Sequence, residues 1–369
     1  MRNITEKLYV AFELSNKKWK LGFSNGEKMR YETISACDLG AFKMALKKAR
    51  QKLTLADDGL IYSIYEAGRD GFWIHRWLEQ LGVDNVVADS SSIEVSRRKR
   101  RAKTDRLDVE SLLRCLMRYH AGERKVFSVV NVPSIEQEDE RRAEREISRI
   151  KKEYNAGKVR IESLLKLQGL SMPGKRSFEQ KLEQLRDWNG QKITVLVKAE
   201  ILRHWERMQL ADKQLKELAK QRRHCLKEPK TQAEQVSSKL YKIKGIGELS
   251  SRVLSLEFFS WRDFKNVRQV GACAGLVGMA YSSGDKHTEQ GISKSGNKRV
   301  RTLMIEIAWG WLNWQRDSKL SQWFIERYGT GSKRSRRVGI VALARKLLVA
   351  LWKYLEFDEV IEDMIFKPV

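Results

Sequence analysis

The sequence predicts a mixed α/β N-terminal domain, a long helical arm and a mainly α-helical C-terminal domain. Three features support this prediction. Short runs of alternating apolar residues occupy the first 90 or so positions, as expected for strands with one buried face. Residues 134–235 are rich in charged residues and leucine, contain few glycines and repeat at helical spacing. Helical patterns then continue around glycine-containing turns. We therefore expect domains over residues 1–130, 131–236 and 237–369.

The first domain is expected to alternate strands and helices. Period-two patterns predict strands over residues 7–15 and 19–23, and further strands are expected over residues 29–34, 60–66 and 84–89. Helical patterns predict helices over residues 38–53, 70–81 and 104–120. This order is similar to the ribonuclease H or RuvC-like arrangement, in which helices cover the faces of a sheet. Such a fold is compatible with many functions, so the function has to be argued from a site.

Four acidic residues of this domain are candidates for a metal site. Glu13 lies on the first strand, Glu66 ends the fourth, and Asp105 and Asp108 share one face of the last helix. In the expected fold these places converge at one edge of the sheet, where four carboxylates would repel unless cations neutralised them. Hard oxygen ligands of this kind suit Mg²⁺ or Mn²⁺. Each acid alone is better explained as a solvated surface acid, whereas the set of four favours the metal site.

A dense basic run directly precedes the last helix of this domain. It is expected to hold a phosphate backbone beside the metal. The residues concerned are Arg97, Arg98, Lys99, Arg100, Arg101 and Lys103.

The arm is expected to contain two long helices that form an antiparallel or an intermolecular coiled coil. The apolar repeat includes Ile147, Ile150, Val159, Met208 and Leu210. A spacer or a dimerisation element is the preferred interpretation, ahead of any chemical role.

The C-terminal domain opens with a pattern typical of a helix-hairpin-helix, residues 241–254. Gly245 and Gly247 would let the backbone approach a phosphate group, and the next helix would present its N-terminal amides. A glycine-containing turn between two core helices is the common alternative.

A loop rich in glycine, serine and basic residues follows, at residues 275–303. The stretch Ser282-Ser283-Gly284 places two serine hydroxyls where the chain can turn sharply. A serine nucleophile needs activation and charge stabilisation, which nearby cations or a metal can supply. Composition alone favours a phosphate-binding loop without covalent chemistry. The residues that could hold phosphate oxygens there are Lys294, Asn297, Lys298, Arg299 and Arg301.

Two further C-terminal patterns are less specific. The tryptophans at positions 309, 311, 314 and 323 have helical spacing, which favours core packing over stacking on bases. Residues 332–337 are expected to form a basic loop.

Composition points to a polyanionic partner. The chain of 369 residues has a net charge of +25, which indicates nucleic acid ahead of an anionic membrane surface or simple solubility. No apolar run approaches the length of a membrane span, so no membrane partner is expected. Four scattered cysteines favour reduced thiols in a cytosolic protein over disulfides or a zinc site.

Several short stretches along the chain together resemble one family. They are Ala11-Phe-Glu-Leu-Ser15, Tyr65-Glu-Ala-Gly68, Lys103-Thr-Asp-Arg-Leu-Asp108, Gly245-Ile-Gly247, Gly275-Leu276, Ser282-Ser-Gly284 and Gly291-Ile-Ser-Lys-Ser-Gly-Asn297. In this order and spacing they resemble the transposases of the insertion sequence 110 family over nearly the whole chain. That family joins a RuvC-like acidic domain, a coiled-coil arm and a C-terminal serine domain.

The resemblance implies specific roles. The family's Asp, Glu, Asp, Asp set maps to Glu13, Glu66, Asp105 and Asp108, with Glu13 in place of the first Asp. The nucleophile maps to Ser283, with Ser282 adjacent. This serine would form a covalent phosphoserine link to DNA, while the acidic domain of a partner subunit supplies Mg²⁺ or Mn²⁺.

The resemblance also implies partners. A structured bridge-type guide RNA would pair with donor and target DNA, and dimers would assemble to a tetramer in the bacterial cytoplasm, associated with the nucleoid. Two alternatives remain. One is a RuvC-like metal-dependent Holliday junction endonuclease that forms no covalent adduct. The other is a non-catalytic nucleic-acid-binding protein.

Overall fold

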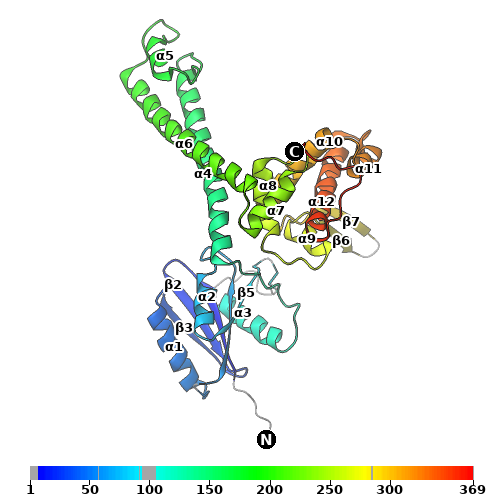
Figure 1. The fold of residues 1–369 in the computed structure, drawn as a ribbon. Helices are drawn as coiled ribbons and strands as arrows, with labels where there is room; N and C mark the ends of the chain where they lie inside the picture. Colours follow the sequence, from blue (N-terminus) through cyan, green and yellow to red (C-terminus); the bar gives the residue numbers. More distant parts are fainter. Residues whose placement is uncertain (1–6, 57, 91, 94–104, 284–285, 369) are drawn as a thin grey trace. The chain divides into compact units, whose positions relative to one another are not determined.

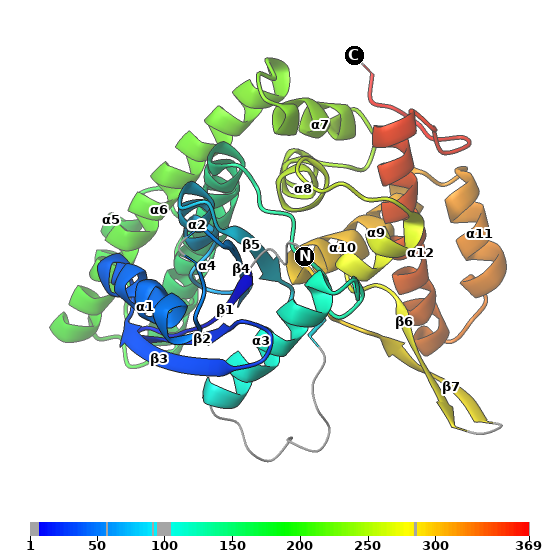
Figure 2. The same cartoon turned by 90° about the horizontal axis from the view of Figure 1, so that it is seen from below.

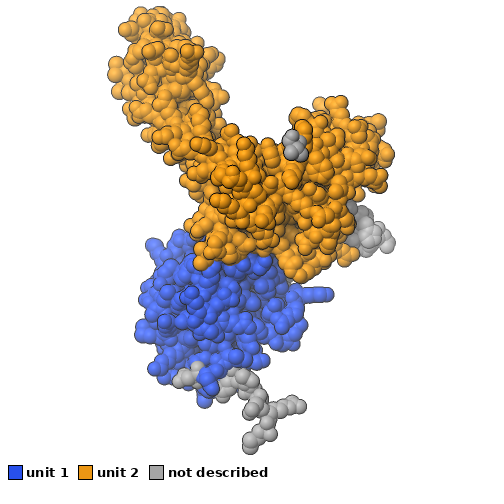
Figure 3. All heavy atoms as spheres, in the orientation of Figure 1, with its two compact units in different colours: residues 1–132 blue, residues 133–369 orange. Residues whose placement is uncertain are grey.

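The computed structural model describes residues 7–56, 58–90, 92–93, 105–283 and 286–368. For residues 280–283 and 286–290 the description covers the backbone only. The chain divides into two compact units, Met1–Val132 and Pro133–Val369 (Figure 3). Among the described residues, no helix combines the length and the apolar character that crossing a membrane requires.

The first unit is built on a five-stranded mixed sheet with the strand order β3-β2-β1-β4-β5 (Figure 1). The strands β1, β2 and β3 form an antiparallel meander, whereas β4 pairs parallel with β1 and β5 pairs parallel with β4. Their bounds are β1 (Lys7–Leu14), β2 (Lys18–Ser24), β3 (Met29–Ser35), β4 (Leu60–Glu66) and β5 (Asp84–Ala88). The strands predicted from alternation are confirmed.

Helices cover both faces of this sheet. The side chains of Leu8, Val10 and Phe12 pack with the helices α1 (Leu39–Lys52) and α2 (Trp73–Gln80). The intervening residue Ala11 packs with Ile64 against α3 (Asp105–His120) on the other face. The central strands are therefore buried on both sides, as parallel strands usually are. The helices predicted for this domain are confirmed.

One glycine sets the distance between α3 and the sheet. A Cβ atom on Gly22 of β2 would lie 2.4 Å from Cγ1 of Val109. Real Cβ atoms do not approach so closely, so a larger residue would push the helix away. The absence of a side chain at position 22 lets α3 pack directly on the meander.

The second unit begins with an arm of two long helices, α4 (Ile135–Lys166) and α6 (Val195–Lys227). They lie side by side and run in opposite directions, with the short helix α5 (Phe178–Gln184) at the tip (Figure 1). Phe178 stacks on Trp205 there, with 4.0 Å between the ring centroids. Val159 and Leu210 belong to the apolar repeat in the sequence, but both side chains are exposed.

The rest of the second unit is mainly helical, with one small hairpin (Figure 2). Leu343, Leu347 and Leu351 of the last helix form the centre of its core. The helices are α7 (Gln232–Tyr241), α8 (Glu248–Leu254), the π-helical turn η2 (Ser255–Phe259), α9 (Val267–Cys273), α10 (Lys298–Trp314), α11 (Lys319–Tyr328) and α12 (Lys333–Phe357), and the strands are β6 (Gly278–Ser283) and β7 (Lys286–Ile292).

Three expectations for this region need correction. The stretch expected as a loop contains the antiparallel pair β6 and β7. The basic segment expected as a loop is the first turn of α12, where the Ser332 hydroxyl caps the helix by accepting a bond from the Ser335 amide. Of the tryptophans expected in the core, Trp311 is buried, whereas Trp309 and Trp314 are exposed because they lie on other faces of α10.

Candidate functional site

Glu13 and Glu66 end adjacent parallel strands. The register pairs Phe12 of β1 with Tyr65 of β4, so the next residue on each strand is the glutamate. Alternation places both on the face that α3 covers, since Ala11 and Ile64 contact that helix. Both line a pocket of about 420 Å³, together with Ser15, Asn16 and Asp70, among others.

Glu13, Glu66 and Asp70 offer carboxylate oxygens of the kind that Mg²⁺ and Mn²⁺ prefer, and Arg69, which lines the same pocket, pairs with Asp70 at 3.6 Å. The donor set around Glu13 and Glu66 therefore fits a hard divalent ion. Asp70 lines the same pocket and was not singled out from the sequence. The sequence feature that could have indicated Asp70 is its position shortly after the Ala67-Gly68 turn that follows β4.

The structure does not bring Asp105 and Asp108 into this pocket. The helix α3 crosses the sheet obliquely: the His120 ring at its end contacts Tyr62 of β4, with 3.9 Å between the ring centroids, whereas Arg106 near its start lies over Tyr31 of β3. Asp105 is exposed and Asp108 half-buried on this first turn. Within the described ranges, no three His, Cys, Asp or Glu side chains lie close enough together to hold a metal ion.

The basic run before α3 lies outside the described residues. This applies to Arg97, Arg98, Lys99, Arg100, Arg101 and Lys103.

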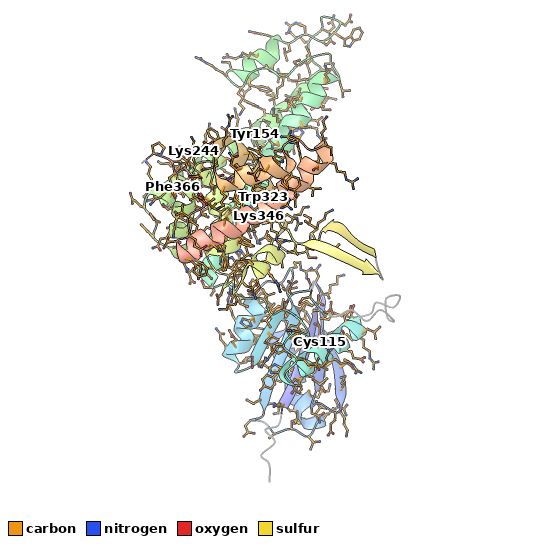
Figure 4. The ribbon with its side chains drawn as sticks, turned by 90° about the vertical axis from the view of Figure 1, so that its right-hand side faces the viewer. Cys115, Tyr154, Lys244, Trp323, Lys346 and Phe366 are labelled. Carbon is orange, nitrogen blue, oxygen red and sulfur yellow. The ribbon has the colours of Figure 1, made fainter. Side chains whose placement is uncertain are left out.

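The two candidate serines end strand β6. The backbone register pairs Ser282 with His287 and Ser283 with Lys286 across the hairpin. Gly284 lies outside the described residues. The described strands of the hairpin project from the helical body in two views (Figures 2 and 4).

Close backbone packing fixes the foot of this hairpin. Gly275 has φ +67°, and a Cβ there would lie 2.0 Å from the Ser295 carbonyl oxygen. Gly296 has φ +103°, and its Cβ would lie 2.3 Å from the Cys273 carbonyl oxygen. The Asn297 amide also donates to that Cys273 oxygen at 2.8 Å. Only glycine fits these two positions without strain.

Three of the five predicted phosphate ligands near the hairpin bond within the chain. The Asn297 side chain caps α10 and donates to the Glu257 carbonyl oxygen. Arg299 donates to the Glu257 carboxylate and to the Ser148 hydroxyl. Arg301 donates to the Ala274 carbonyl oxygen. By contrast, Lys294 and Lys298 are exposed.

Glu257 is the buried centre of this network. Its side chain is 1% exposed and accepts two bonds from Arg145, at 2.9 and 3.0 Å, and one from Arg299 at 3.1 Å. Burial by itself would raise the pKa of the Glu257 carboxyl. The hydrogen bonds from Arg145 and the charges of Arg145, Arg141 and Arg299 lower it by more, so the pKa lies below its ordinary value. No sequence pattern singles out Glu257, because its partner Arg145 is 112 positions away.

The predicted helix-hairpin-helix turn is packed against the end of the chain. Gly245, with φ +94°, lies between α7 and α8, and a Cβ there would lie 3.2 Å from the Cβ of Trp314. The Lys367 ammonium donates to the carbonyl oxygens of Tyr241 and Ile246. Gly247 caps the N-terminus of α8. The turn thus has a structural part in joining α7, α8 and the C-terminal segment.

Comparison with known proteins identifies the family. A model described as "Transposase IS116/IS110/IS902 family" matches residues 237–322. The chain is 39% identical to the candidate transposase y4rJ of Sinorhizobium fredii, over 98% of this chain and 94% of that protein. It is 27% identical to the transposase for insertion sequence element IS1111A of Coxiella burnetii, over 70% of this chain and 68% of the relative. The chain therefore belongs to the IS110 family of insertion-sequence transposases.

Proposed function

We propose that this transposase cuts and rejoins DNA through a covalent bond to Ser283. The observation that carries the proposal is the position of Ser282 and Ser283 at the end of a projecting hairpin, inside the segment that matches the family model. In the proposed step the serine oxygen bonds to phosphorus and the bond from phosphorus to one strand oxygen breaks. The serine proton ends on that leaving hydroxyl, so the bond energy is kept in the phosphoserine ester.

The acidic pocket is proposed to serve the same reaction. Glu13 and Glu66 would hold a divalent cation, with Asp105 and Asp108 as the remaining carboxylates. When bound, Mg²⁺ or Mn²⁺ would stabilise the negative charge that develops on the phosphoryl oxygens. The adjacency of Glu13 and Glu66 at the carboxyl ends of parallel strands supports this part of the proposal.

The strand order β3-β2-β1-β4-β5 supports a RuvC-like fold for the first unit. We propose that the α4–α6 arm acts as a coiled-coil dimerisation element, and that dimers assemble to a tetramer in which one subunit's acids act with another's serine. A bridge-type guide RNA would pair with donor and target DNA. The net charge of +25 is consistent with a protein that holds both nucleic acids.

The experiment incubates the full-length protein and its flanking non-coding RNA with labelled DNA from the element ends and Mg²⁺. A denaturing gel then separates free DNA from protein-linked DNA. Wild-type protein should give a covalent adduct that Ser283→Ala lacks and that Ser282→Ala retains. Cleavage without an adduct would contradict the proposal and indicate a metal-dependent nuclease of the Holliday junction type. Binding without any cleavage would indicate a non-catalytic protein.

A further inference from the structure

A groove of about 1180 Å³ lies beside the foot of the serine hairpin. The helix α12 forms one wall. The other walls come from α9, α11, the start of β6 and the end of β7. We refer to it as the α12 groove. Neither the proposed serine chemistry nor the proposed metal site uses it.

Part of the lining of the α12 groove is apolar and open to solvent, and we call these apolar residues its floor and the basic residues of the lining its rim. Val338 is 59% exposed and Met279 is 43% exposed, and Val341, Val349 and Leu320 continue the apolar surface. Contiguous exposed apolar surface on a folded protein usually marks a binding site, because leaving it in contact with water is unfavourable.

The rim of the groove is strongly cationic. None of the described residues that line it is acidic. Lys346 lies beside Trp323, with 4.7 Å between its ammonium and the ring centroid (Figure 4). Lys353 pairs with the exposed Glu359, a weak surface ion pair. The cations are Lys294, Arg334, Arg337, Arg345, Lys346 and Lys353. Along α12 they span about 28 Å at the rise of an α-helix.

This combination matches one class of ligand. A row of cations without acids selects a polyanion, and the chain belongs to a family of transposases. A duplex presents phosphates and sugars outward and has few apolar groups to cover an apolar floor. A single strand exposes the faces of its bases, which can pack on apolar side chains while its phosphates meet the rim.

We propose that the α12 groove binds a single-stranded stretch of polynucleotide. Phosphates lie on the rim cations, and base faces lie on Val338, Val341 and Met279. The groove begins at the foot of the β6–β7 hairpin, so a strand bound there would lead toward Ser283. The inference that the bound strand leads toward Ser283 rests on the proposed function, whereas the proposed binding of a single strand does not.

The test uses the full-length protein and three labelled probes of equal length: oligo-dT, oligo-U and a DNA duplex. Fluorescence anisotropy is measured over a series of salt concentrations. Val338→Gln with Met279→Gln changes the floor at exposed positions. It should weaken single-strand binding by at least about fivefold, the low end of the loss of one base stack. Duplex binding should change by less than twofold.

Arg334→Gln with Arg337→Gln changes the rim. Each lost phosphate contact should reduce the salt slope for the single strand by about 0.7, so the pair should reduce it by about 1.4. The matched control is Arg316→Gln with Arg327→Gln, two exposed cations of the same unit that do not line the groove. The control should leave the slope within about 0.7 of the wild-type value. Circular dichroism checks that every variant is folded.

The probes identify the source of the strand. A loss mainly for oligo-dT indicates DNA and a loss mainly for oligo-U indicates RNA, and either supports the proposal. An equal loss for duplex and single strand would overturn it, as would unchanged single-strand binding. A changed oligomeric state of the floor variant in analytical ultracentrifugation, with binding intact, would also overturn it by assigning the groove to a protein interface.

The outcome does not depend on the serine chemistry. Ser283→Ala protein should bind oligo-dT as wild type does, because binding precedes cleavage. If Ser283→Ala still formed the adduct while the groove variants lost single-strand binding, the proposed nucleophile would be wrong and the groove assignment would stand.

Discussion

Replacing Glu257 by Gln should destabilise the second unit substantially. The substitution keeps the size of the side chain but removes the negative charge that Arg145, Arg299 and Arg141 surround. Breaking a buried ion pair by removing one partner typically costs about 3–5 kcal/mol, because the other charge is left without a partner. Arg145 and Arg299 are partly exposed, so water screens part of the penalty. We therefore expect about 3 kcal/mol.

Thermal unfolding of the full-length protein measures this effect. For a unit of this size, a loss of about 3 kcal/mol should lower the Tm by about 6–12 °C. The matched control is Glu162→Gln, which removes an exposed ion pair with Lys158 on α4, in the same unit. Such exposed helical pairs contribute about 0.3–0.5 kcal/mol, so the control should melt within about 2 °C of wild type.

The pH dependence provides a second check on Glu257. Its pKa is lowered on folding, so its stabilising contribution is present above the pKa of an unfolded glutamate, about 4.3, and is lost as the pH falls through the folded value. The difference in the free energy of unfolding between wild type and Glu257→Gln should therefore have its full size near pH 7 and decrease below about pH 4. Equal melting of the two proteins at pH 7, or a difference that does not change with pH, would refute this reasoning.

Three other substitutions test separate parts of the structure. Gly275→Ala should cost about 1–3 kcal/mol in urea unfolding, because its Cβ would collide with the Ser295 carbonyl at a positive φ; an unchanged midpoint contradicts this. Trp205→Ala should cost about 3–5 kcal/mol by removing the ring that stacks on Phe178, and a loss below about 1 kcal/mol would show that the arm tip is not a packed core. Glu66→Gln should slow DNA cleavage by about a hundredfold or more without weakening DNA binding, whereas retained cleavage would remove the acidic pocket from the reaction.

The first unit was largely predictable from local sequence patterns. Strands such as β1 and β4 are short, largely apolar runs of full strand length, and the Asp38 side chain caps α1. The parity of these strands also places Glu13 and Glu66 on one face, and the structure shows that they share a pocket. The oblique path of α3 was not predictable, because it depends on packing against Gly22 and Tyr31 of distant strands.

The second unit was less predictable for physical reasons. The sequences of β6 and β7, GMAYSS and KHTEQGI, do not alternate apolar and polar residues over the length of a strand, so periodicity gives no signal. Only the Gly284-Asp285 pair between the strands is typical of a tight hairpin turn. The basic composition after Ser332 suggested a solvated loop, although serine followed by arginine and lysine also suits a helix start. Glu257 finds its partners only through the tertiary fold.

The central claim is that Glu66 and Ser283 belong to one reaction and act from different subunits. The most direct measurement mixes full-length Glu66→Gln and Ser283→Ala proteins, each inactive alone, with the element's end DNA, RNA and Mg²⁺. If one subunit's acids act with another's serine, mixed assemblies contain complete sites and should restore the covalent adduct on the Glu66→Gln chain. If both groups must come from the same chain, the mixture should stay inactive, and that result would contradict the account.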